Sequence, residues 1–159
     1  MLRRHFLYAT AALMAAPFAS GLASRMARAE GFPFTLTEAE WRARLSDMSY
    51  RVLREEETER PNTSRLNTEK RVGTYHCAGC DQAAFASTTK YDSGTGWPSF
   101  WEPLPNAIVT RADPGLFGAR TEVHCSRCGG HFGHVFTDGP EPTGLRYCMN
   151  GAALTFKAA

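Results

Sequence analysis

Short runs of alternating apolar and polar residues, separated by glycine and proline, fill the chain from residue 73 to its end. Alternation with a period of two places every second side chain on the same face of an extended strand. The runs that predict strands are residues 73–77, 83–87, 97–103, 106–110, 119–125, 133–139, 145–150 and 153–158. Because several short strands joined by turns form sandwiches or barrels, the pattern predicts a mainly β domain of that kind.

The region before residue 73 predicts two short helices that pack against this β core. Thr37 is followed three residues later by Glu40, which is the spacing of a capping box at the start of a helix. Either Ser46 or Ser49 begins a second helical stretch, and Pro61 ends it.

The first 29 residues differ from the rest of the chain. They contain basic residues but no acidic ones, continue with an apolar, alanine-rich run, and end in Ala27-Arg28-Ala29. This order of features predicts a secretory signal peptide that is cleaved after residue 29. Arg3 and Arg4 resemble the twin-arginine signal of proteins that are exported already folded, although Leu2 stands where that signal favours Ser or Thr.

A retained membrane anchor is the alternative for this segment, because residues 6–23 approach the length that spans a bilayer. Proline, serine and glycine interrupt the run, and alanine makes it only weakly hydrophobic, which favours cleavage. We therefore expect a signal peptide at residues 1–29 and a single domain at residues 30–159. The expected location is the periplasm, with no stable membrane insertion after cleavage.

The charge of the mature chain argues against a nucleic-acid partner. Four of the 18 basic residues and none of the 16 acidic residues lie in residues 1–29, so the formal charge falls from +2 to −2 without them. A nucleic-acid-binding protein would need a positive surface, which this balance does not favour. Glu55, Glu56 and Glu57, with Glu59 nearby, predict a solvated acidic face rather than a site.

Four of the five cysteines form two C-x-x-C pairs, Cys77 with Cys80 and Cys125 with Cys128. Two such pairs supply the four thiolates of a tetrahedral zinc site. Because no position would remain for water, we expect one structural Zn²⁺ per chain rather than a catalytic one. Two structural disulfides or a thioredoxin-like redox pair are the alternatives. A disulfide within a C-x-x-C pair is usually strained, however, and neither pair precedes a predicted helix.

The spacing of the two pairs distinguishes this site from a compact zinc ribbon. The second pair begins 45 positions after Cys80, whereas a ribbon has about 15–20 residues between its pairs. The ion is therefore expected to clamp distant parts of the β core.

The fifth cysteine, Cys148, lies on the predicted strand 145–150. Arg146 and Asn150 share its face at a period of two. Arg146 favours the thiolate, which is the nucleophilic form of cysteine, and Asn150 offers an amide that can donate or accept. An inert buried cysteine is the alternative, but these polar neighbours favour a reactive thiol. The residues on the opposite face are Leu145, Tyr147 and Met149.

His131 and His134, with Asp138, offer acid or base groups close in sequence to Cys148. In a regular strand the two histidines would point to opposite faces, so a shared site requires a bulge or turn at Gly133. The alternatives are a metal-ligand role or a packed core histidine. Trp97, between Gly96 and a proline, lies in a predicted loop where its indole face could hold a methyl group.

Four segments together resemble the B-type methionine-R-sulfoxide reductase family, and the resemblance extends from about Tyr50 to Phe156. These segments are CAGC, KYDSGTGWPSF, CSRCGGHFGHVFTDGP and TGLRYCMNGAALTF. The resemblance implies a mainly β fold of two antiparallel sheets, of β-tent type, with short N-terminal helices and a structural zinc clamp. It also implies thiol-dependent reduction of methionine-R-sulfoxide in proteins or peptides.

The resemblance assigns roles residue by residue. It places the nucleophile at Cys148 and implies that Trp97 packs on the substrate methyl group. The polar shell that binds and protonates the sulfoxide oxygen would consist of His131, His134, Asp138, Arg146 and Asn150. Attack by Cys148 would yield methionine and a cysteine sulfenic acid.

The chain departs from many members at Thr95, where they carry a resolving cysteine. Since the other four cysteines are assigned to the metal, the resemblance implies direct reduction of Cys148 by an external, thioredoxin-like thiol donor. We expect a monomer. A zinc-ribbon binding module would leave Cys148 unexplained, and a cysteine–histidine hydrolase would leave Trp97 unexplained.

Overall fold

The computed structural model describes residues 31–114 and 118–159. The predicted signal segment, residues 1–29, lies outside the described residues. The described part is mainly β, with two antiparallel sheets and two short α-helices, which confirms the predicted fold class. No helix within residues 31–114 and 118–159 is long and apolar enough to cross a bilayer.

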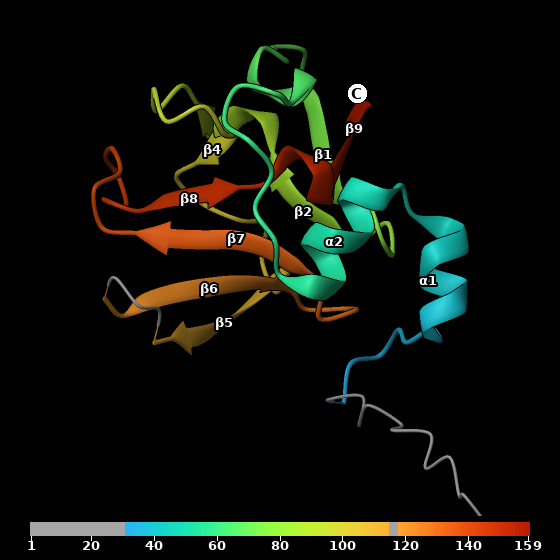
Figure 1. The fold of residues 1–159 in the computed structure, drawn as a ribbon. Helices are drawn as coiled ribbons and strands as arrows, with labels where there is room; N and C mark the ends of the chain where they lie inside the picture. Colours follow the sequence, from blue (N-terminus) through green and yellow to red (C-terminus); the bar gives the residue numbers. More distant parts are fainter. Residues whose placement is uncertain (1–30, 115–117) are drawn as a thin grey trace, which may run out of the picture.

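The two helices begin at the capping residues that the sequence indicates. Helix α1 (Glu38–Arg44) starts after Thr37, whose side chain and that of Glu40 form the predicted capping box. Helix α2 (Asp47–Glu55) starts after Ser46 and ends with Glu56 in the left-handed region, at φ 59° and well before Pro61. In Figure 1, α2 lies against the sheets and α1 lies outside it.

The smaller sheet has three strands in the order β2-β1-β9. Its strands are β1 (Gly73–Cys77), β2 (Ala83–Ala86) and β9 (Leu154–Ala158). These bounds agree with the predicted runs to within one residue. The last strand of the chain therefore pairs with the first, which brings the C-terminus beside β1 (Figure 1).

The larger sheet has six strands in the order β3-β4-β8-β7-β6-β5. Its strands are β3 (Lys90–Tyr91), β4 (Ser99–Phe100), β5 (Ile108–Asp113), β6 (Arg120–Cys125), β7 (His131–Phe136) and β8 (Arg146–Met149). Three short 3₁₀ turns complete the elements: η1 (Arg65–Asn67), η2 (Ser87–Thr89) and η3 (Gly151–Ala153). Strand β8 lies between β4 and β7, so both of its neighbours contribute side chains beside it.

A cluster of buried aromatic side chains fills the space between the sheets. Tyr75, Phe85, Phe100 and Phe132 are fully buried, and the rings of Phe85 and Phe100 stack with centroids 4.4 Å apart. Burying a side chain of this size contributes about 1.5–3 kcal/mol. This packing stabilises the positions of β7 and β8 in the larger sheet.

Candidate active site and metal centre

The four cysteines of the two C-x-x-C pairs meet in one buried cluster that joins the two sheets. The Sγ atoms of Cys77 and Cys128 lie 3.7 Å apart, and those of Cys80 and Cys125 lie 3.5 Å apart. All four ligand atoms lie within 4.8 Å of one another. Tetrahedral bonds of about 2.3 Å place sulfurs about 3.8 Å apart, so the cluster fits zinc. The predicted clamp between distant strands is confirmed as a cluster of four thiols, and the identity of the ion stays a prediction.

A second group of potential metal ligands lies on β6 and β7. Atoms of Glu122, His124 and His131 also lie within 4.8 Å of one another. However, the guanidinium of Arg111 donates to Glu122 Oε2 through Nη2 at 2.7 Å. Because a cation already neutralises this carboxylate, the four-thiol cluster is the better metal centre.

Cys148 lies on β8 in the interior of the six-stranded sheet. Its backbone neighbours are Ser99 on β4 and His134 on β7. Directly paired residues of antiparallel strands project from the same face, with Cβ atoms about 4.5–5.5 Å apart. Cys148 is partly exposed, and Thr95 Oγ1 lies 3.7 Å from its Sγ. Cys148 therefore has hydroxyl groups on one side and an imidazole on the other.

A β-bulge in β7 brings His131 and His134 to the same region, as a shared site requires. The pairing of β6 with β7 shifts between Val123 and His124, and Gly133 adopts φ 151°. A Cβ atom at Gly133 would lie 2.2 Å from the carbonyl oxygen of Cys148. The two rings lie 5.5 Å apart between centroids. The predicted bulge at Gly133 is confirmed, whereas the chemical role of each histidine is not tested by this geometry.

Each histidine has a carboxylate partner that the sequence analysis did not identify. Nδ1–H of His131 donates to Glu122 Oε1 at 2.5 Å, and Nε2–H of His134 donates to Asp113 Oδ2 at 3.0 Å. Glu122 lies on β6, 9 residues before His131, and Asp113 lies on β5, 21 residues before His134. A carboxylate on one ring nitrogen fixes the tautomer and orientation of an imidazole.

The buried Glu122 carboxylate is held ionised by its neighbours. Burial raises the pKa of Glu122, but the hydrogen bonds from Arg111 and His124 outweigh this and hold it below its usual value. Burial lowers the pKa of His131, and the nearby Glu122 offsets this only in part. Burial thus favours the neutral form of the His131 ring, and the contact with Glu122 places its proton on Nδ1.

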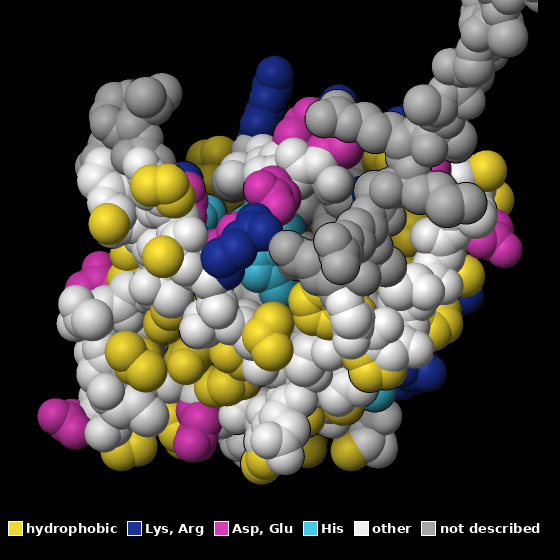
Figure 2. Space-filling model, turned by 90° about the horizontal axis from the view of Figure 1, so that it is seen from below, with side chains coloured by type: hydrophobic (Ala, Val, Ile, Leu, Met, Phe, Trp, Pro, Cys, Tyr) yellow, Lys and Arg dark blue, Asp and Glu magenta, His cyan; other side chains and the backbone are white. Residues whose placement is uncertain are grey.

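A cavity of about 380 Å³ opens beside both histidines. Its lining includes Glu56, Thr58, Arg111, Asp113, Glu122, His131 and His134. Figure 2 shows histidine side chains in a hollow of this face, beside basic and acidic groups. The hollow gives solvent or a ligand a path towards the imidazoles. Glu56 faces this surface, as predicted for a solvated acidic residue.

Asp138 lies against Arg146 rather than against a histidine. The guanidinium of Arg146 donates to both carboxylate oxygens of Asp138, at 2.9 and 2.8 Å, and lies 4.3 Å from the ring centroid of Phe136. Asp138 raises the pKa of Arg146, and the charge of Cys148 adds to this. Asp138 thus orients the cation that shares a strand with Cys148.

Glu59 connects Trp97 with Asn150, and it was missed because the sequence analysis placed it on a solvated face. That prediction is wrong, because Glu59 is buried. Its carbonyl oxygen accepts from Trp97 Nε1–H at 3.1 Å, and its N–H donates to Asn150 Oδ1 at 3.0 Å. Its carboxylate accepts from the backbone N–H groups of Gly151 and Ala152. These η3 donors need an acceptor, which explains why a carboxylate is buried here.

The amide of Asn150 is committed to the backbone on both sides. Besides accepting from Glu59, it donates through Nδ2 to the carbonyl oxygen of Phe132 at 3.1 Å. Trp97 remains partly exposed, with its indole N–H anchored. The arrangement fixes the end of β8 and the orientation of the indole.

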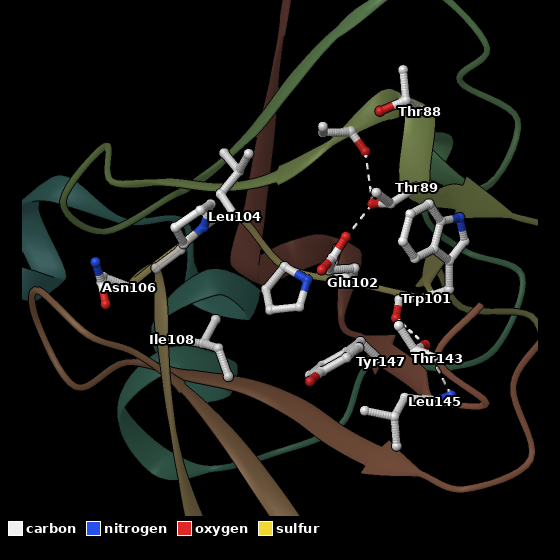
Figure 3. Close-up of a pocket in the computed structure, with 14 residues that line it drawn as sticks. Thr88, Thr89, Trp101, Glu102, Leu104, Asn106, Ile108, Thr143, Leu145 and Tyr147 are labelled. Atoms are coloured by element: carbon white, nitrogen blue, oxygen red, sulfur yellow. Dashed lines mark hydrogen bonds between the residues drawn. The ribbon is translucent and has the colours of Figure 1, made fainter. Parts of the chain in front are cut away.

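The opposite face of β8 lines a different cavity, of about 590 Å³. Figure 3 shows Leu145 and Tyr147 facing this hollow together with Trp101, Leu104 and Ile108. None of the residues predicted for the site line it. The predicted division of this strand into two faces is therefore confirmed.

Comparison with known proteins gives a consistent result over most of the chain. Residues 45–158 match the family model described as SelR domain. A Pseudomonas putida (strain W619) protein named peptide methionine sulfoxide reductase MsrB is 53% identical over 122 residues, which are 76% of this chain and 92% of the relative. Relatives of the same name from Agrobacterium fabrum and Thiobacillus denitrificans are 48% and 53% identical, again over 76% of this chain and over 90% and 92% of their own lengths.

Proposed function

The chain belongs to the SelR-domain family of peptide methionine sulfoxide reductases of the MsrB type, and from this premise we propose that it reduces methionine-R-sulfoxide in proteins or peptides to methionine. The observation that carries this proposal is the position of Cys148 on β8, directly paired with His134. A thiol beside an imidazole that a carboxylate orients supplies both a nucleophile and an acid.

In the proposed reaction the Cys148 thiolate attacks the sulfoxide sulfur while its oxygen is protonated. The S–O bond of the sulfoxide breaks and an S–O bond to Cys148 forms. The sulfoxide sulfur is reduced by two electrons and leaves as the thioether of methionine, while Cys148 is oxidised by two electrons to a sulfenic acid. Trp97, anchored through its N–H to Glu59, offers the indole face on which the methyl group packs. Arg146, which Asp138 orients, lies two positions from Cys148 on β8 and offers a positive charge to the attacking thiolate.

We infer that His134 is the proton donor. It pairs directly with Cys148, and its Nε2–H donates to the Asp113 carboxylate, which orients the ring. His131 is more deeply buried and holds its proton towards Glu122. We expect His134→Asn to lower kcat by at least about 100-fold with a small change in KM. A larger loss in His131→Asn would reverse the assignment.

The sulfenic acid is then reduced by external thiols. A first thiol displaces water from the sulfenic sulfur and forms a mixed disulfide, and a second thiol releases Cys148 as the disulfide of the donor forms. Thr95 stands beside the Cys148 sulfur, so no second thiol is available at that position. A thioredoxin-like protein of the export compartment fits this requirement, and the chain acts as a monomer in this proposal.

One experiment tests the proposed function against its alternatives. The metal-loaded protein is incubated with dithiothreitol and a peptide that contains racemic methionine sulfoxide, and the two epimers are then resolved. We expect loss of the R epimer alone, and Cys148→Ser abolishes it. Consumption of both epimers, or activity that survives Cys148→Ser, would contradict the proposal. Hydrolysis of an ester substrate would favour a cysteine–histidine hydrolase instead.

We also propose that residues 1–29 direct the chain to the periplasm and are removed there. The basic start, the apolar run and the Ala27-Arg28-Ala29 ending support this. The intact mass of the exported protein is expected to correspond to a chain that begins at Glu30. An unprocessed mass in the membrane fraction would indicate a retained anchor.

A further inference from the structure

Three hydroxyl groups form a continuous chain that ends at the Cys148 sulfur. Thr95 Oγ1 lies 3.7 Å from Cys148 Sγ. Ser93 Oγ lies 2.8 Å from Thr95 Oγ1 and 2.7 Å from Ser99 Oγ. Ser99 is fully buried, and its hydroxyl also lies 3.3 Å from the carbonyl oxygen of Trp97. The chain therefore runs from a fixed backbone acceptor to the reactive sulfur.

The hydrogen bonds along this hydroxyl chain can be donated in either of two opposite directions. Each hydroxyl has one hydrogen to donate and can accept at the same time. When Cys148 is a thiol, it donates to Thr95, and the donation passes through Ser93 and Ser99 to the Trp97 carbonyl. When Cys148 is a thiolate, the direction reverses. Ser99 then donates to Ser93, Ser93 donates to Thr95, and Thr95 donates to the sulfur.

We propose that Thr95, Ser93 and Ser99 act as a reversible hydroxyl relay that donates a hydrogen bond to the Cys148 thiolate and so keeps the thiol reactive without a resolving cysteine. Thr95 contacts the reacting atom and is a catalytic residue, while Ser93 and Ser99 position its hydroxyl hydrogen. The hydrogen bond to the thiolate is inferred from these distances. The role of the relay in turnover rests on the proposed function.

A hydrogen bond to a charged group contributes more than one between neutral groups, and hydrogen bonds in a chain strengthen one another. The other charged or titratable groups near the sulfur are Arg146 on its own strand, His134 on β7 and Tyr91 on β3, with Asp138 beyond Arg146. Arg146 is already bonded to both oxygens of Asp138. Among the described residues, the hydroxyl of Thr95 is the hydrogen-bonding group found within reach of the Cys148 sulfur.

The relay is tested by comparing Thr95→Val with Thr95→Ser. Valine keeps the shape of the side chain but removes the hydroxyl, whereas serine keeps the hydroxyl. The metal-loaded proteins are alkylated with iodoacetamide between pH 6 and pH 10, and the rate is read by mass spectrometry on the tryptic peptide that contains Cys148. At pH 7 we expect alkylation of Thr95→Val to be at least about 10-fold slower, because the variant loses a hydrogen bond to the charged sulfur, which contributes more than a hydrogen bond between neutral groups. The rates should converge at high pH, and Thr95→Ser should follow the wild type.

Ser93→Ala supplies a second, independent comparison, because it leaves Thr95 in place but interrupts the chain behind it. We expect the alkylation rate of Ser93→Ala at pH 7 to lie between the rate of Thr95→Ser and the rate of Thr95→Val. Identical pH profiles for Thr95→Val and Thr95→Ser would overturn the relay. Because alkylation needs no sulfoxide, this result can be told apart from a failure of the proposed reductase activity, which the epimer assay reports.

Discussion

Cys148 receives its chemical neighbours from several separate parts of the chain. His134 and Ser99 flank it from β7 and β4, Thr95 reaches its sulfur from a loop, and Arg146 shares its strand. In the proposed reaction Thr95 and Arg146 act on the thiolate, and His134 acts on the sulfoxide oxygen. At the scale of single residues, the site is therefore tested by exchanging these neighbours one at a time.

Thr95→Cys is expected to restore an internal route of reduction. Thr95 Oγ1 is already 3.7 Å from Cys148 Sγ, so a sulfur at this position can reach the sulfenic acid by a rotamer change. After one turnover without added thiol, we expect the variant to lose two thiols and form a disulfide between positions 95 and 148. The wild type should instead retain the mass of one added oxygen. Peptide mapping distinguishes the two, and a persistent sulfenic acid in the variant would contradict the geometry.

Glu122→Gln is expected to slow the reaction without removing the fold. The amide can still accept from Nδ1–H of His131, but the charge that orients the ring and balances Arg111 is lost. We expect kcat to fall about 10–100-fold. Glu56→Gln is the matched control, because Glu56 also binds Arg111 but is exposed and not bonded to His131. Equal kinetics of the two variants would contradict a role for Glu122.

The contacts of Glu122 and Glu59 could not be predicted from the sequence. The predicted site residues lie in motifs of a few positions, so Cys148 and both histidines could be proposed from the sequence. Glu122 and Glu59 act across strands and loops that only folding brings together. Glu122 lies two positions from His124 on a strand, which places both on one face and is the only signal that could have indicated it.

At the scale of elements, the β-bulge in β7 determines where its two histidines lie. The bulge places His131 and His134 in one region. It depends on Gly133 because this residue has a φ of 151° and because β8 approaches it closely. The need for a bulge could be predicted from the spacing of the two histidines. Strand β4 was predicted too long, at 97–103 rather than Ser99–Phe100. Pro98 has no N–H to donate, and only its carbonyl oxygen is used, by the N–H of Met149.

Gly133→Ala is expected to be strongly destabilising. The added Cβ would lie 2.2 Å from the backbone oxygen of Cys148, so β7 and β8 must separate. We expect a loss of at least about 2 kcal/mol in the free energy of unfolding, measured by urea denaturation. Gly144→Ala is the control, because Gly144 also has a positive φ, 68°, but open space around its Cα. It should cost about 1 kcal/mol from backbone strain alone. A similar loss in both variants would show that the contact with β8 does not matter.

At the scale of the molecule, the two sheets are held together by the aromatic core and by the four-thiol cluster. Each pair of cysteines lies in a knuckle where a strand ends, Cys77 on β1 and Cys125 on β6. The long spacing of the pairs predicts a clamp between distant strands. The order of strands could not be predicted, because the pairing of β9 with β1 and of β8 with β4 depends on packing between sheets.

Removal of the metal is expected to unfold much of the domain, because ion and fold are coupled in a closed four-thiolate site. Without it, four ionisable thiols remain buried and close together. We expect one zinc per chain in the purified protein and a large drop in the melting temperature on chelation, since structural zinc contributes on the order of 10 kcal/mol.

Cys125→Ser should lose both the ion and the cooperative transition. Cys148→Ser should retain one ion and melt like the wild type while losing all reductase activity, because its sulfur contacts Thr95 rather than the cluster. Loss of zinc in Cys148→Ser would show that the assignment of the five cysteines to two separate tasks is wrong.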